Sequence, residues 1–219
     1  MQRSSRLINI LSTIVAICLV TILPHLGLIP LPFGYVVPVL LFIFLYLKFR
    51  KETIVGNGFR WSDFRFHAVV IGTITGVVLF FFLNHLFFPL LKQLVPLPPA
   101  DISFAQQLKG NTGFYLFLLL MGWLVGGFYE EFVFHGFMFT QLEKILPARK
   151  VIVMSVLLTN LVFALYHFQL GYEGVLNAFL AGMVYHLLIL RFKRNLWYGI
   201  ICHAVFDTVA LTMLYLGFT

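Results

Sequence analysis

The sequence predicts an all-α protein, a multi-pass integral membrane bundle of about seven transmembrane helices. The chain is 61% hydrophobic and only 11% charged, with 26 phenylalanines among its 219 residues, whereas about a quarter of the residues in a soluble domain are charged. The apolar residues are also gathered in stretches close to the roughly 20 residues that a helix needs to span a bilayer. We therefore expect a single membrane domain over residues 1–219.

Seven apolar stretches are candidates for these helices. The first follows two arginines, as a signal peptide would, but it lacks a small-residue cleavage site, so we expect it to be a retained helix. The second is short, and the fourth is long enough to be strongly tilted or broken at Gly126-Gly127. The stretches cover residues 7–28, 34–47, 67–91, 113–142, 151–168, 173–190 and 196–217.

The basic residues predict the orientation of the chain. With a cytoplasmic N-terminus, 13 of the 15 Lys and Arg residues fall in cytoplasmic segments, and only Lys92 and Lys109 fall outside. This skew follows the positive-inside rule. The net charge of +7 is spread between apolar stretches, so the expected partner is the lipid bilayer and not nucleic acid. Cys18 and Cys202 lie in apolar stretches and are expected to be buried free thiols.

Two adjacent carboxylates, Glu130 and Glu131, lie inside the fourth apolar stretch. A charged side chain is costly inside a membrane, so such residues usually face a cavity or a partner. Two neighbouring carboxylates disfavour simultaneous ionisation, and a carboxylate that titrates near neutral pH is a suitable general base. The pair therefore predicts either a catalytic base or a buried acidic pair that only fixes helix packing.

Histidines at membrane depth supply partners for these carboxylates. His135 follows Glu131 by four residues and shares its helix face, so it is either the partner of Glu131 or a catalytic group. We favour the role of partner. His167 ends the sequence FALYH near the outer end of its helix, where it is either a site residue or an interfacial one. Two more histidines have no acidic companion in their own stretches and are expected to be packing or interfacial residues: His85 and His186.

A second acid–histidine pair lies in the last stretch, in the sequence HAVFD. His203 and Asp207 are four residues apart, and a carboxylate beside an imidazole fixes its tautomer and orientation. The pair is either part of a site or a helix-packing hydrogen bond. Two histidines and a glutamate would also satisfy an open zinc site, so zinc held by Glu130, His167 and His203 is an alternative to a metal-free mechanism.

Three motifs together resemble the CPBP intramembrane proteases, which include the type II CAAX prenyl endopeptidases and the bacterial Abi and bacteriocin-immunity proteins. The motifs are EEFVFHG (130–136), FALYH (163–167) and HAVFD (203–207). They occur in the order of the family's Glu-Glu-x-x-x-Arg, Phe-x-x-x-His and His-x-x-x-Asn/Asp helices. Each motif alone is weak, but the ordered set in a multi-pass chain is fairly specific. The motif core covers about residues 113–210.

The resemblance implies an intramembrane endopeptidase that acts on a membrane-associated peptide or protein. In the family pattern, Glu130 is the general base that activates the attacking water, with assistance from His167. His203 and Asp207 stabilise the oxyanion, and Glu131 supports the site through its partner. The resemblance favours a glutamate-based mechanism without bound zinc, so we expect no cofactor. We expect the protein in a bacterial plasma membrane.

One residue departs from this pattern, because His135 stands where the family has an arginine. An arginine holds a permanent charge against the glutamates, whereas a histidine can be neutral. The difference leaves open a catalytically weak or inactive membrane scaffold or immunity factor that binds a protein partner. A transporter would also use polar residues at depth, but the sequence shows no inverted repeat.

Overall fold

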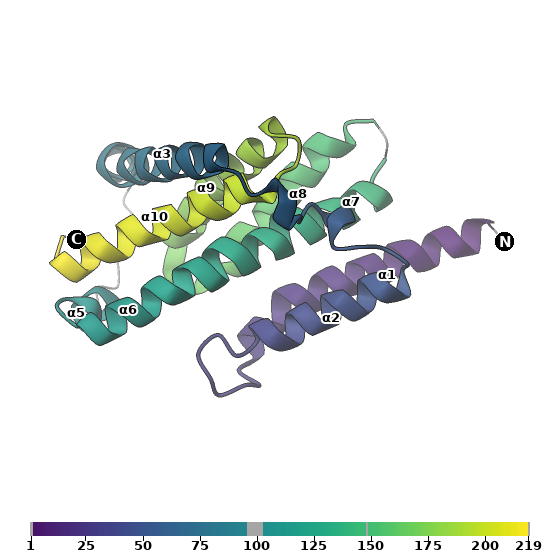
Figure 1. Cartoon of the computed structure of the whole chain (residues 1–219), viewed down its shortest axis with the longest axis horizontal. Coiled ribbons are helices and arrows are strands. Elements are labelled where there is room, and N and C mark those ends of the chain that lie inside the picture. Colours follow the sequence, from purple (N-terminus) through teal and green to yellow (C-terminus); the bar gives the residue numbers. More distant parts are fainter. Residues whose placement is uncertain (1, 96–102, 148, 219) are drawn as a thin grey trace.

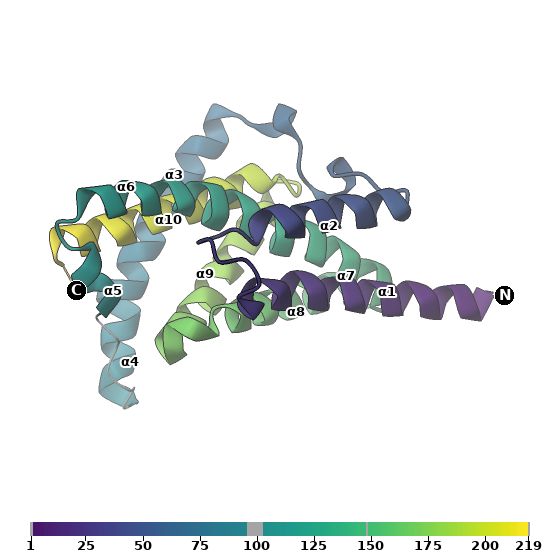
Figure 2. The same cartoon turned by 90° about the horizontal axis from the view of Figure 1, so that it is seen from below.

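The computed structural model describes residues 2–95, 103–147 and 149–218, and every secondary-structure element in these ranges is helical (Figures 1 and 2). The elements are α1 (Gln2–Ile22), η1 (Leu23–Leu26), α2 (Val36–Phe49), η2 (Val55–Asn57), η3 (Trp61–Asp63), α3 (Phe66–Phe82), η4 (Leu83–Phe87), α4 (Phe88–Leu94), α5 (Ser103–Leu108), α6 (Thr112–Met121), η5 (Gly122–Met138), α7 (Phe139–Ile145), α8 (Val151–Tyr166), η6 (Phe168–Leu170), α9 (Gly171–Arg191) and α10 (Leu196–Leu216).

The predicted multi-pass helical bundle is confirmed. Within the described residues, five helical segments are long and apolar enough to cross a membrane by length and composition: Leu7–Leu26, Phe66–Leu94, Thr112–Ile145, Phe168–Arg191 and Leu196–Leu216. Two shorter apolar helices, α2 and α8, match the other two predicted stretches. The prediction missed α5, a short helix of six residues before α6.

The last helix, α10, is the central element of the bundle. It packs against α3, η5, α9 and α6 (Figure 1). Glycines on α3 make the α3–α10 contact close, since a Cβ at Gly76 would lie 2.5 Å from the carbonyl oxygen of Cys202, and one at Gly72 would lie 2.8 Å from the Cβ of Ile201. Small residues of this kind let helix backbones approach each other within a membrane. Asn195 caps the start of α10, and its Oδ1 accepts a hydrogen bond from the Trp197 backbone amide at 3.0 Å.

The long fourth stretch is one continuous helical segment, Thr112–Ile145, and it is not broken at the glycine pair. Its middle part, η5, is π-helical, and π-helical geometry is frequent at functional sites. Eleven consecutive residues, Tyr129–Phe139, are buried. A helix covered on every side is expected to be a central element of the protein, so both glutamates of the pair lie inside the bundle.

The α1 and α2 helices lie beside each other at one side of the bundle (Figure 2). The segment after α2 is tied to α7, because Glu52 accepts hydrogen bonds from Lys144 Nζ and Gln141 Nε2, both at 2.6 Å. Burial raises the pKa of Glu52, but these donors and the nearby positive charges outweigh it and lower that pKa below its usual value. One expectation is wrong, since the thiol of Cys18 is exposed on α1 while that of Cys202 is buried.

Substitution of Gly76 by alanine is predicted to destabilise the protein. The added methyl group meets the α10 backbone, and such overpacking costs about 1–3 kcal/mol. The matched control is Gly113→Ala on α6, where the nearest atom to an added Cβ is 3.9 Å away. Unfolding of both variants in detergent, followed by circular dichroism, measures the difference. Equal stability of the two variants would contradict the close α3–α10 contact.

Candidate active site

Four of the predicted site residues line one cavity of about 380 Å³: Glu130, His167, His203 and Asp207. They come from three parts of the chain that are far apart in sequence. Glu130 is on η5, His167 follows the last residue of α8, and the other two residues are on α10. The structure therefore brings the three sequence motifs together in one place.

Glu131 lies behind this cavity and is completely buried. Its two oxygens are bonded to two different histidines, Oε1 to Nδ1 of His203 at 2.9 Å and Oε2 to Nδ1 of His135 at 2.8 Å. A buried carboxylate is costly unless it is paired and hydrogen-bonded. Both oxygens are satisfied here, so Glu131 is a structural anchor and is not open to a substrate.

The ring of His203 is oriented by Glu131. Because Nδ1 is bonded to Glu131, Nε2 points the other way, toward Asp207 Oδ2 at 3.7 Å and Glu130 Oε2 at 4.0 Å. The ring also stacks on Tyr185, with centroids 4.6 Å apart. The carboxylate that fixes the tautomer of His203 is Glu131, on a different helix, since Asp207 Oδ2 lies beyond the usual hydrogen-bond range.

Glu130 is 7% exposed and makes no hydrogen bond as short as those of Glu131. Its Oε2 lies 3.6 Å from Nε2 of His167 and 4.0 Å from that of His203, beyond the usual range of about 2.7–3.2 Å for a direct N–H···O bond. The two adjacent glutamates therefore differ in environment. Glu131 is bonded at both oxygens, and Glu130 keeps its oxygens available to molecules in the cavity.

His167 is placed by the end of α8. Its Nδ1 donates a hydrogen bond to the carbonyl oxygen of Phe163 at 2.8 Å, which leaves Nε2 facing Glu130. The chain then reverses through η6, and Gly171 at φ +71° begins α9. Only glycine adopts this conformation without a steric penalty. His167 thus lines the cavity, and its place at a helix end, expected from the sequence, allows it to reach inward.

Glycines of η5 make room for Asp207. A Cβ at Gly126 would clash with Oδ2 of Asp207, and one at Gly122 would lie 3.4 Å from its Cβ. The next glycine, Gly127, lets η5 approach Ala204 in the same way. These glycines, four and five residues apart, bring α10 close enough to η5 for the two helices to share a site.

His135 is the partner of Glu131, as the spacing predicted, and two further residues belong to the same polar cluster. Nε2 of His135 lies 3.3 Å from Oδ1 of Asn160, and Nδ2 of Asn160 lies 3.1 Å from Nδ1 of His186. All three side chains are buried. His186 is a buried packing residue, as expected, and its contact with Asn160 also makes it part of this polar cluster. A sequence signal for Asn160 existed, because an amide in an apolar membrane helix usually bonds across helices.

The residue types around the cavity suit zinc, which takes imidazole nitrogens and a carboxylate. Their arrangement does not, because no three His, Cys, Asp or Glu side chains of the described residues are placed to hold a metal ion. We therefore derive no catalytic step through a metal, and metal content stays a prediction.

Comparison with known families agrees with the motifs. Residues 112–209 match the family described as type II CAAX prenyl endopeptidase Rce1-like. The matched range is slightly less than half of the chain and contains all three motifs and the six predicted site residues. The resemblance to the CPBP group is thereby confirmed, and it points in general to an intramembrane protease. Searches of curated proteins and of solved structures found no match.

The two glutamates are predicted to differ in their effect on stability. Glu131→Gln replaces one acceptor oxygen with an amide that cannot accept from a histidine, and breaking a buried pair costs about 3–5 kcal/mol. Glu130→Gln removes no short hydrogen bond and should destabilise the protein less than Glu131→Gln does. Detergent unfolding curves compare the two variants. A larger loss from Glu130→Gln would contradict the assignment of Glu131 as the anchor.

Proposed function

Starting from the CPBP resemblance over residues 112–209, we propose that the chain is an intramembrane endopeptidase that hydrolyses a peptide bond with a glutamate-activated water. The observation that carries the proposal is the shared cavity of Glu130, His167, His203 and Asp207. Such a set combines a general base with groups that can stabilise an oxyanion. These four residues come from three separate parts of the chain, all within the matched range.

In the proposed reaction, Glu130 takes a proton from a water molecule near Nε2 of His167, and the water oxygen attacks the carbonyl carbon of the peptide bond. The carbonyl oxygen becomes an oxyanion beside His203 and Asp207. An Nε2–H of His203 that donates to this oxyanion requires both ring nitrogens to be protonated, because the Nδ1 proton is shared with Glu131. Glu130 then gives its proton to the leaving nitrogen, and the carbon–nitrogen bond breaks.

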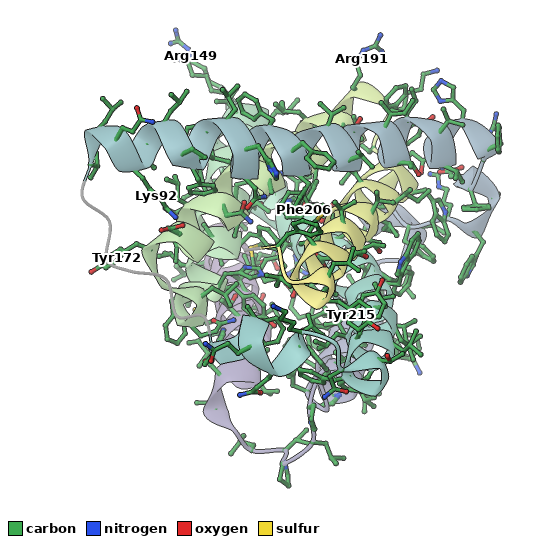
Figure 3. The ribbon with its side chains drawn as sticks, turned by 90° about the vertical axis from the view of Figure 1, so that its left-hand side faces the viewer. Lys92, Arg149, Tyr172, Arg191, Phe206 and Tyr215 are labelled. Carbon is green, nitrogen blue, oxygen red and sulfur yellow. The ribbon has the colours of Figure 1, made fainter. Side chains whose placement is uncertain are left out.

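The substrate in this proposal is a membrane-associated peptide or protein. A larger cavity of about 930 Å³ between α3, α4, α9 and α10 shares four lining residues with the site cavity: Gly174, Asn177, Ala210 and Leu214. Lys92 at its edge pairs with Glu173 across α4 and α9, with Nζ 3.0 Å from Oε2 (Figure 3). This neighbouring space supports a route for an extended peptide. The skew of basic residues supports a cytoplasmic N-terminus, and the membrane in this proposal is a bacterial plasma membrane.

The alternative function is a scaffold or immunity factor that binds a protein partner without cleavage. The observation that favours it is His135 in the position of the family's arginine. The two functions differ in their dependence on Glu130, because a scaffold tolerates the nearly isosteric change to glutamine and an enzyme does not.

Glu130→Gln, Glu130→Ala and His203→Ala are predicted to lower cleavage of a native substrate by at least about 100-fold, the usual contribution of a general base or an oxyanion donor. The control is Glu143→Gln, whose carboxylate pairs with Arg194 outside the cavity. Cleavage is followed by mass spectrometry with reconstituted protein, and folding by circular dichroism. Wild-type turnover in both Glu130→Gln and His203→Ala would reject the peptidase proposal.

The proposed mechanism predicts no stoichiometric zinc, because Glu130 acts as the base and the described residues provide no three-ligand metal site. Elemental analysis of protein purified without chelators measures the metal content. One zinc per chain, together with loss of activity on chelation and recovery on zinc addition, would contradict the metal-free mechanism.

A further inference from the structure

The surroundings of His135 show how this residue acts in place of an arginine. Its side chain has no exposed surface, so its two ring nitrogens interact only with the protein groups around them. Nδ1 lies 2.8 Å from Oε2 of Glu131, and Nε2 lies 3.3 Å from Oδ1 of Asn160. One partner is a carboxylate and the other is an amide oxygen. Both are hydrogen-bond acceptors.

The orientation of the Asn160 amide is set by its other contacts. Nδ2 donates to the carbonyl oxygen of Val156 at 2.8 Å, and it also lies 3.1 Å from Nδ1 of His186. A rotated amide would place its oxygen against the Val156 carbonyl, where neither group can donate. Oδ1 therefore faces His135. A histidine with an acceptor at each nitrogen makes both hydrogen bonds only if both nitrogens carry protons.

We propose that His135 is a positioning residue held as an imidazolium between Glu131 and Asn160. Its ring then supplies the positive charge that an arginine would supply at this position. This proposal rests on the proposed function for its catalytic consequence. The charge keeps Glu131 ionised, and ionised Glu131 accepts the Nδ1 proton of His203. The Nε2 atom of His203 then stays directed into the cavity.

The polar groups that face His135 come from its own segment, from α8 and from α9, and they include the ring of Tyr185, whose centroid lies 6.5 Å from that of His135. Glu131 on the same segment is the one acidic group bonded to it among the described residues, and Asn160 and His186 approach from α8 and α9. His186 accepts from Asn160 at Nδ1, so it carries its proton at Nε2 and adds no positive charge.

A second cavity lies between His135 and the loops that contain Arg60 and Lys193. This cavity of about 180 Å³ is lined by His135 and by four charged residues: Arg60, Asp63, Lys193 and Arg194. It is separate from the active-site cavity, whose lining does not include His135. Because the His135 side chain has no exposed surface, its ring is open to neither cavity.

The protonation state can be tested without any activity. Protein labelled with ¹⁵N-histidine in detergent is measured by NMR at pH 7, and the His135 signals are assigned with His135→Gln. We expect both nitrogens of His135 to be protonated in the wild type. A single protonated nitrogen at His135 would overturn the proposal, whether or not the protein cleaves peptides. If both are protonated and no substrate is cleaved, the proposed function fails and this inference stands.

The catalytic consequence is tested by the pH profile of cleavage. Asn160→Leu removes one of the two acceptors of the charged ring, so we expect cleavage to be lost at a lower pH than in the wild type. Asn160→Asp, which keeps an acceptor at the same place, should move that loss to higher pH.

The matched control is Thr159→Val, a nearly isosteric change of the neighbouring buried side chain, whose hydroxyl has no partner in the described structure. It should leave the pH profile unchanged. An unchanged profile in both Asn160 variants would overturn the positioning role of His135. If the Asn160 variants do not fold, the NMR measurement on the wild type still decides.

Discussion

The buried carboxylate of Glu131 is the interaction on which the site depends. It has no exposed surface and joins His203 of α10 to His135 of its own segment through hydrogen bonds of 2.9 and 2.8 Å. An ionised group in such a place is stable only while its partners are present, because it cannot be hydrated. Fold and site are therefore coupled, since the contact that orients the His203 ring also stabilises the approach of α10 to η5.

Glycines make this coupling possible. Gly126 and Gly127 allow η5 to approach Asp207 and Ala204, and a Cβ at Gly199 would lie 2.6 Å from Oε2 of Glu131. Within a membrane, helices gain little from burying apolar side chains against each other, because lipid is equally apolar. Close backbone contact and polar bonds between helices must supply the stabilisation, and here both occur at the same place. The cost of the buried polar cluster is thus offset where the helices are closest.

Most of the helices could be predicted from the sequence, because a run of apolar residues long enough to span a bilayer has few other structures available. The six-residue helix α5 could not, since it is too short to carry a periodic signal. Helix spacing identified the partner of Glu131 but could not show that the carboxylate bonded to His203 is Glu131 and not Asp207. Asn160 and its contact with His186 were missed because they join different helices, and spacing along one helix carries no information about such contacts.

Glu130 and Glu131 are adjacent in the sequence, and this places two carboxylates with different surroundings at the same depth in the bundle. Consecutive residues of a helix point about 100° apart in regular α geometry, so neighbours face different surroundings when the helix is covered on every side. Glu131 faces two histidines and is fully bonded, whereas Glu130 faces the cavity with its oxygens 3.6 and 4.0 Å from the nearest imidazole nitrogens. A glutamate one turn away would lie at another depth and could not serve the same histidine. Adjacency therefore lets one ring, His203, be held by one carboxylate and act beside the other.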